Sequence, residues 1–156
     1  MCSNKRRNNG CSNNYAFYVS EFMAIVNENF NKIVDKIITN VLINSKVNAK
    51  ALWDTGANCC CISFDLVNKL NLKPIGALPI ATPSGTAIYN KYMIDIELPN
   101  NIEIKDVTVC ESEIGAQKLD LIIGMNIINK GDFAISNYNG VTKFSFRIPT
   151  NADINL

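Results

Sequence analysis

The clearest chemical signal in the sequence is the run Ala-Leu-Trp-Asp-Thr-Gly-Ala at residues 51–57. An apolar strand is predicted to end at Asp54, which offers a carboxylate. Thr55, which offers a hydroxyl, and Gly56 follow it. Two aspartates that share one proton across a water molecule can hydrolyse a peptide bond, one as base and one as hydrogen-bond donor to the scissile carbonyl. An aspartate at a strand end can also start a turn, so the tripeptide alone is weak evidence.

The absence of histidine narrows the chemistry that this chain can perform. None of the 156 residues is a histidine. This removes nucleophiles activated by imidazole and every zinc site that needs an imidazole ligand. Hydrolysis would therefore have to use carboxylates, lysine, tyrosine or thiols, and we expect neither a metal nor another cofactor.

Composition and charge favour one globular domain and argue against two classes of partner. The length suits one domain, and hydrophobic residues make up 47% of it, enough for a sizeable core. The formal net charge is +1 and the only basic cluster is at residues 5–7, so the field that attracts nucleic acid is missing. No apolar run approaches membrane-spanning length, and residues 15–19 are too short for a signal peptide. We expect a cytoplasmic protein that binds neither nucleic acid nor membrane.

The six cysteines have no spacing typical of a metal site. They are Cys2, Cys11, Cys59, Cys60, Cys61 and Cys110. No C-x-x-C pair occurs, and three successive strand side chains cannot all face one metal ion. We interpret the cysteines as small buried hydrophobic residues in a reducing compartment. A disulfide or metal site at Cys2 and Cys11 is the alternative for the N-terminal segment.

From residue 33 onward, short apolar strands alternate with turns, which is typical of a mostly β barrel or sandwich. Ser63 is expected to cap a short helix, and a second short helix is expected over 125–130, ending with Gly131 at its C′ position. Hairpins are predicted over residues 37–53, around residues 83–86, over residues 92–110 and over residues 133–148.

The region before residue 33 is harder to interpret. Residues 1–32 are expected to form an N-terminal extension, partly disordered or helical, and residues 33–156 the domain itself. Within residues 15–34 the apolar positions fit one face of a helix, yet residues 22–26 fit a strand equally well. Both alternatives stay open.

The sequence around the Asp-Thr-Gly run resembles the retropepsin family of aspartic proteases. That family pairs Asp-Thr-Gly-Ala with a downstream hydrophobic-hydrophobic-glycine and then a short helix, and residues 119–124 read Leu-Asp-Leu-Ile-Ile-Gly. Residues 131–137 and 144–149 look like cellular, bacterial or phage members. The resemblance covers residues 33–149 and implies a closed β-barrel or sandwich with one or two short helices, active as a homodimer.

The resemblance makes Asp54 the catalytic residue, with Thr55, Gly56 and Ala57 as its support. It implies that Thr55 interlocks with its dimer mate through hydroxyl hydrogen bonds, and that Gly56 lets the substrate backbone approach. The sequence has no second Asp-Thr-Gly. Two copies of the chain must therefore meet about a two-fold axis to build a dyad.

Five further residues receive a role from the same resemblance. Ser84 and Gly85 look like the bend of a flap that closes over a polypeptide substrate. Ile122 and Ile123 are expected to pack beneath the Asp54 turn. Gly124 is expected to admit the loop close behind it.

Two departures from the viral pattern bear on the dimer and on the function. The acidic residue after the alanine and the arginine after the downstream glycine, which pair across the dimer, are Asn58 and Met125 here. No orphan charge is left, but other contacts must hold the dimer, and residues 144–148 or 15–34 are the candidates. The function implied is an aspartic endopeptidase acting on polypeptides. The alternative is a dimeric retropepsin-like peptide-binding module that is non-catalytic or weakly active.

Overall fold

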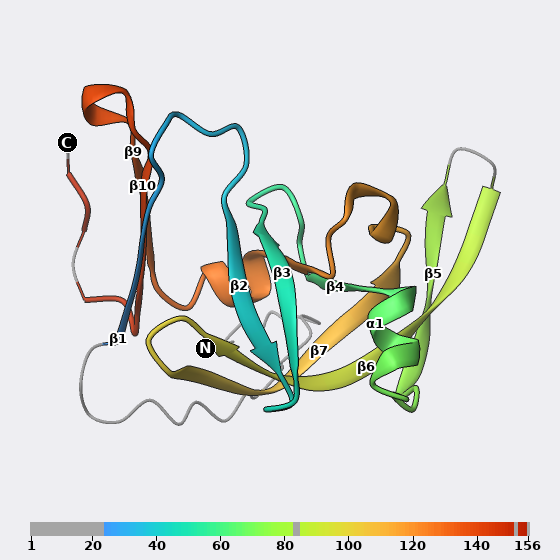
Figure 1. Ribbon diagram of the computed structural model, residues 1–156. Coiled ribbons are helices and arrows are strands. Elements are labelled where there is room, and N and C mark those ends of the chain that lie inside the picture. The colour runs from blue at the N-terminus through green and yellow to red at the C-terminus, as the bar shows by residue number, and fades with distance from the viewer. Residues whose placement is uncertain (1–23, 83–84, 152, 156) are drawn as a thin grey trace, which may run out of the picture.

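The computed structural model describes residues 24–82, 85–151 and 153–155, and this part of the chain is mostly β (Figure 1). The elements in chain order are β1 (Ala24–Asn29), β2 (Ile38–Ile43), β3 (Val47–Trp53), β4 (Cys60–Ser63), α1 (Phe64–Lys69), β5 (Gly76–Thr82), β6 (Gly85–Leu98), β7 (Ile102–Ser112), η1 (Gly115–Gln117), β8 (Leu121–Ile123), α2 (Met125–Ile128), β9 (Asp132–Ser136), η2 (Tyr138–Gly140) and β10 (Lys143–Ile148).

Six strands close into a barrel. They follow one another in the order β2, β3, β8, β4, β7 and β6, and a further pairing of β6 with β2 closes the sheet. The strand β5 pairs with β6 beyond this ring, so the β5–β6 hairpin stands out from the barrel at the right of Figure 1. The mostly β, barrel-type fold expected from the sequence, with two short helices, is therefore confirmed.

The hairpin predicted over residues 37–53 is β2 with β3. Its strands alternate, with Val41 and Ala49 buried in the barrel and Asn40 and Lys50 exposed. At the turn, Asn44 and Ser45 have φ values of 50° and 52°. Two successive positive φ values are what a type I′ turn requires, and its twist matches that of the flanking strands.

The second and third predicted hairpins share a strand. Residues 85–91 of β6 pair with β5, and residues 91–98 pair with β7. An irregularity in register between Ile94 and Ile96 accompanies the pairing with β7. The sequence suggested separate strands because Asn90 and Lys91 interrupt the apolar alternation; the structure instead continues one 14-residue strand through them.

The two helices are short. Ser63 caps α1 as predicted, since its hydroxyl accepts a hydrogen bond from the Leu66 N–H at 3.2 Å. Gly131 follows α2 but does not have the positive φ expected of a C′ residue. A Cβ there would overlap the carbonyl oxygen of Arg147, so close packing explains this glycine. Within the described residues, no helix combines the length and apolar character needed to cross a membrane.

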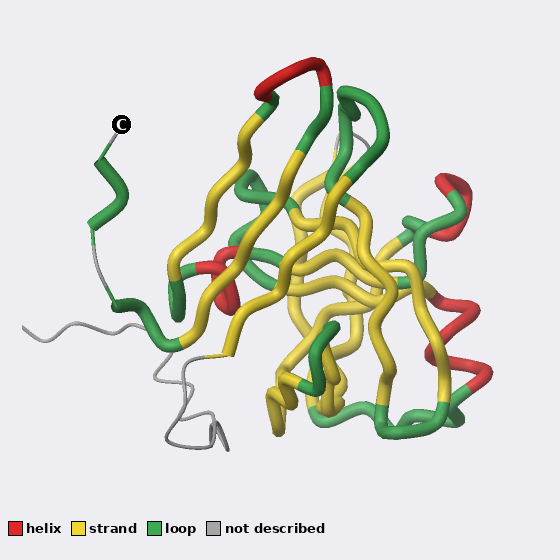
Figure 2. Tube along the Cα trace, turned by 60° about the vertical axis from the view of Figure 1, so that its left-hand side comes forward, coloured by secondary structure: helices red, strands yellow, loops and turns green. Residues whose placement is uncertain are grey.

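A separate three-stranded sheet, in the order β1-β10-β9, lies beside the barrel (Figure 2). Trp53 at the end of β3 joins the two sheets: its ring centroid lies 4.9 Å from those of Phe144 and Phe146 and 6.1 Å from that of Phe133. The Trp53 indole N–H also donates to the Thr39 hydroxyl at 3.0 Å. The end of β3, directly before Asp54, is thus fixed by contacts with both sheets.

The N-terminal part of this sheet decides between the two alternatives for residues 24–29. They form the strand β1, in antiparallel register with β10 from Ala24 opposite Ile148 to Asn29 opposite Lys143. Val26 is fully buried in the same core as Phe144. These residues therefore fold with the C-terminal hairpin rather than as a helix, and residues 1–23 lie outside the described part.

Candidate active site

The loop after β3 orients the Asp54 carboxylate. The Asp54 N–H donates to the Ile123 carbonyl at 3.0 Å, and the Ala57 N–H donates to the Asp54 carbonyl at 3.2 Å. The Gly56 N–H donates to Asp54 Oδ1 at 2.8 Å. Asp54 is half-buried, while Thr55 and Gly56 are exposed. One carboxylate oxygen is thus held by its own turn, in a loop that presents its next two residues to the surface.

The strand β8 fixes this loop from below. It lies between β3, to which it is parallel, and β4, to which it is antiparallel. Just after it, the Met125 N–H donates to the Ala57 carbonyl at 2.8 Å. A Cβ on Gly124 would lie 2.6 Å from the Cys59 carbonyl oxygen and 2.8 Å from that of Ala57, so only glycine fits at this distance.

The other residues predicted for the site lie as follows. Ile123 is buried in the barrel directly under the Asp54 backbone, whereas Ile122, half-buried, faces the opposite side of β8. Gly85 begins β6 at the tip of the β5–β6 hairpin with φ +128°, a value that side chains rarely adopt. Ser84 lies outside the described residues. The hairpin and the loop after β3 rise toward the same side of the barrel in Figure 1.

A row of in-register residues crosses the outside of the barrel next to Asp54. Leu52 is paired with Ile122, Ile122 with Cys61, Cys61 with Cys110, and Cys110 with Lys91. Directly paired residues share a face of the sheet, and the strand neighbours of Leu52, Ile122 and Cys61 are buried in the barrel core. The row therefore runs on the outer face from the Asp54 strand to the strand of the projecting hairpin.

The sequence suggested that all the thiols of this region are buried, but they are not uniformly buried. Cys60 and Cys110 are buried, but Cys59 and Cys61 are half-exposed, so the prediction is wrong for the latter two. Cys60 points into the core, where burial raises the pKa of its thiol to about 12. Cys61, the next residue of β4, lies on the other face because alternate strand residues point in opposite directions.

The remaining carboxylates have structural roles. Asp120 accepts a hydrogen bond from the Lys50 N–H at 2.8 Å, which links the residue before β8 to β3. Asp132 accepts from Thr150, from the Asn151 N–H and from Arg147, and these bonds hold the pKa of its carboxyl far below the usual range.

Glu111 is a buried carboxylate on a strand, although its neighbours Ser112 and Glu113 make this part of the sequence polar. It is buried in β7 and accepts hydrogen bonds from the Tyr92 hydroxyl and the Asn90 N–H, both at 2.8 Å. The bond to Glu111 adds to burial in raising the pKa of Tyr92. The pair joins β6 to β7 where the two hairpins meet.

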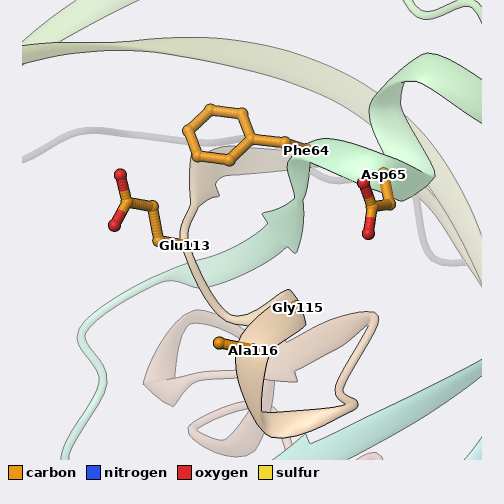
Figure 3. A pocket seen from close by; sticks show the side chains of 5 residues that line it. All are labelled: Phe64, Asp65, Glu113, Gly115 and Ala116. Carbon is orange, nitrogen blue, oxygen red and sulfur yellow. The ribbon is translucent and has the colours of Figure 1, made fainter.

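A surface hollow of about 250 Å³, which Asp54 does not line, lies between α1 and η1 (Figure 3). Phe64, Asp65, Glu113, Gly115 and Ala116 line it. It contains two carboxylates but none of the residues described above. Across the described part of the chain, no group of three or more cysteine, aspartate or glutamate side chains is arranged to hold a metal ion.

Comparison with known proteins places this geometry in a family. Residues 39–130 match the family model described as "gag-polyprotein putative aspartyl protease". A search of curated protein sequences gives no significant match. Among solved structures, the chain is similar to a retropepsin-like aspartic protease from Rickettsia conorii, with 15% identity, a TM-score of 0.56, and coverage of 81% of this chain and 96% of that one.

Two further solved structures are similar. One is the EIAV protease, with 22% identity, a TM-score of 0.49, and coverage of 61% of this chain and 86% of that one. The other is the retroviral protease-like domain of Ddi1 from Leishmania major, with 19% identity, a TM-score of 0.48, and coverage of 72% and 95%.

The closed barrel, with β8 running beneath the loop after β3, has the retropepsin-like aspartic protease fold, as the similarity to the Rickettsia structure shows. The matching family model covers more than half of the chain. The chain belongs to the gag-polyprotein aspartyl protease family.

Proposed function

We propose that this protein is an aspartic endopeptidase whose active site forms between two identical chains. Asp54 of each chain supplies one carboxylate of the dyad, and a water molecule held between them attacks the peptide carbonyl. One carboxylate takes the proton from the water while the other, protonated, donates to the carbonyl oxygen. The observation that carries the proposal is the hydrogen bond of the Gly56 N–H to Asp54 Oδ1, which fixes a half-buried carboxylate beside two exposed loop residues.

The proposal requires a dimer because one chain supplies only one carboxylate of the dyad. The sequence holds one Asp-Thr-Gly, and the carboxylates of Asp120 and Asp132 are engaged in structural hydrogen bonds. A dyad therefore needs Asp54 from a second copy, brought close by a two-fold axis. The exposed Thr55 and Gly56 lie where the two loops would meet.

The outer row gives the substrate a place to lie. Leu52 and Ile122 present half-buried apolar side chains directly beside Asp54. The β5–β6 hairpin rises on the same side, and Gly85 near its tip has the unusual φ that a bend allows. A polypeptide lying between this row and the hairpin would bring a backbone carbonyl toward Asp54. This arrangement suits an enzyme that recognises substrate side chains and hydrolyses the peptide bond.

Of the two segments expected to hold the dimer, residues 144–148 are largely buried within the chain itself. Phe144, Phe146 and Ile148 are at most 2% exposed and pack in the chain's own core, so they are not free for a partner. The strand β1 pairs with β10 on one side, and within the described residues its other edge has no strand neighbour, only the Asn100 amide that donates to the Ile25 carbonyl at 2.5 Å. We assign the additional dimer contact to this edge of the three-stranded sheet.

The test is the Asp54→Asn variant in a cleavage assay on an unfolded protein or a peptide substrate. The amide is nearly isosteric but cannot act as the base, so we expect kcat/KM to fall by roughly 10⁴-fold or more with the fold retained. Asp35→Asn, at an exposed loop position, is the matched control and should keep full activity. Equal activity of both variants and the parent would refute the role of Asp54. A dimer that binds peptides and cuts none would favour the binding-module alternative.

A further inference from the structure

Three thiols gather on the outer face of the barrel, beside the loop that carries Asp54. The sulfur atoms of Cys59 and Cys110 are 3.9 Å apart, although the two residues are 51 positions apart in the sequence. Cys61 is the strand neighbour of Cys110, and its thiol donates to the Cys59 carbonyl at 3.8 Å. The cluster joins three segments of the chain: the end of the loop, β4 and β7.

We propose that Cys59 and Cys110 form an oxidation site, which closes reversibly to a disulfide and ties the loop after Asp54 to β7. A disulfide needs its sulfurs at about 2.05 Å, so the pair must close by about 1.9 Å from its present 3.9 Å. Cys59 precedes β4 and stands outside the strand ladder, which leaves it more freedom to move than Cys110 has in the middle of β7.

The surroundings divide the two roles of attacking and resolving thiol. A hydrogen bond from Cys61 is the main cause that lowers the pKa of the Cys59 thiol to about 6, and Cys110 and the positive charge of Lys91 add to it against the opposing effect of burial. Burial raises the pKa of Cys110 to about 11. Cys59, which is half-exposed and has the lower pKa, is thus the attacking thiol, and the buried Cys110 beside it is the resolving thiol.

Glutathione disulfide is a sufficient oxidant. The Cys59 thiolate attacks one of its sulfurs, forms a mixed disulfide and releases one glutathione thiolate, which takes up a proton. Cys110 then loses its proton to solvent and attacks the Cys59 sulfur, releasing the second glutathione. In total, two protein thiols are oxidised to one disulfide, and one glutathione disulfide is reduced to two glutathione molecules.

The crosslink has a route to the Asp54 loop. The Cys59 carbonyl packs so closely over Gly124 that no Cβ fits between them. The same loop is tied to Met125 through the Ala57 carbonyl. A shift of Cys59 toward β7 therefore disturbs the segment that holds Asp54, and it alters the outer row at Cys110. The expected consequence, a lower cleavage rate in the oxidised protein, rests on the proposed function.

The disulfide can be mapped in the full-length protein without any activity. The protein is incubated with excess glutathione disulfide, free thiols are blocked by alkylation, and tryptic peptides are analysed by mass spectrometry. Cleavage at the flanking lysines puts Cys59 in the peptide 51–69 and Cys110 in the peptide 106–118. We expect these two peptides to be joined, with a mass two hydrogens below their sum. The oxidised protein should run as a single chain on denaturing, non-reducing gels. Dithiothreitol should separate the two peptides again.

Two variants complete the test. Cys59→Ser should lose the joined peptide, whereas Cys61→Ser, which keeps both partners and a hydroxyl donor, should retain it. The inference is overturned if native protein yields no joined peptide, if Cys59→Ser still yields it, or if the disulfide links two copies of peptide 51–69 between chains. A cleavage assay on the same samples separates the two proposals. If the reduced protein never cuts, the proposed function fails while the mapped disulfide stands; if oxidised and reduced protein cut equally, the consequence for activity is wrong.

Discussion

Gly124→Ala is the substitution that tests most sharply how the site is built. Gly124 has φ −96°, a value open to any residue, so a methyl group there adds no backbone strain. Its effect must come from space alone. The new Cβ would lie 2.6 Å from the Cys59 carbonyl oxygen, 2.7 Å from the Cys59 carbonyl carbon and 2.8 Å from the Ala57 carbonyl oxygen. All three are backbone atoms of the loop that follows Asp54.

The required displacement follows from these distances. Real Cβ atoms essentially never approach a neighbour closer than 3.0 Å, so the loop and β8 must separate by at least the difference from 2.6 Å, which is 0.4 Å. Overpacking of this kind costs about 1–3 kcal/mol of folding free energy. For a chain of this length that lowers Tm by roughly 2 to 12 °C. Because a misplacement of about 1 Å at a catalytic group costs about 100-fold in rate, we expect kcat/KM to fall by roughly 10-fold or more.

Gly76→Ala provides the matched control. Gly76 is exposed at the start of β5, and a Cβ there meets no atom within 4 Å. Thermal unfolding followed by circular dichroism, at one protein concentration for all variants, measures the first effect, and cleavage of one peptide substrate measures the second. If Gly124→Ala melts within about 1 °C of Gly76→Ala and cleaves as fast, the argument that β8 holds the Asp54 loop by close packing is wrong.

Three further predictions follow from named contacts. The hydrogen bonds of Asp132 lower the pKa of its carboxyl in the folded state. The stability that this carboxylate adds is therefore complete above the ordinary pKa of about 4 and is lost as the pH falls below that value. The Tm difference between parent and Asp132→Asn should shrink between pH 6 and pH 2, and a constant difference would contradict this. Trp53→Phe leaves the buried Thr39 hydroxyl without its donor and should cost about 1–3 kcal/mol in urea unfolding, part of which Thr39→Val in the same background restores. Specific activity should rise with protein concentration and then level off, since each site needs two chains; a flat profile with a monomeric mass in sedimentation would contradict the dimer.

Much of the fold could be predicted because its signals are local. The β2–β3 hairpin shows strand alternation on both sides of a turn. Ser63 predicts the start of α1, since its hydrogen-bond partner Leu66 follows three residues later. The strand β1 could not be decided, since Phe22, Ile25 and Val26 satisfy both periods and only pairing with β10, more than a hundred residues later, selects the strand. The local pattern predicts a helix end at Gly131, because the contact of this glycine with Arg147 is not local.

The motif of the candidate site can be read from the sequence, whereas the surroundings of that motif cannot. Asp54, Gly56 and Gly124 are visible in the sequence as a motif and a downstream glycine. The parallel pairing of β4 with β7, which sets Cys61 beside Cys110, joins segments about fifty residues apart and leaves no local trace. The three adjacent cysteines look alike in the sequence, but Cys60 is buried whereas Cys59 and Cys61 are half-exposed.

The most direct test of the central claim mixes parent and Asp54→Asn chains. Total protein is held constant, above the concentration at which activity levels off, and the chains are left to exchange before cleavage is measured. If each active site takes Asp54 from both chains, activity falls with the square of the parent fraction, to about one quarter in an equal mixture. If each chain carried a complete site, activity would fall in proportion, to about one half in an equal mixture, and the two-chain dyad would be refuted.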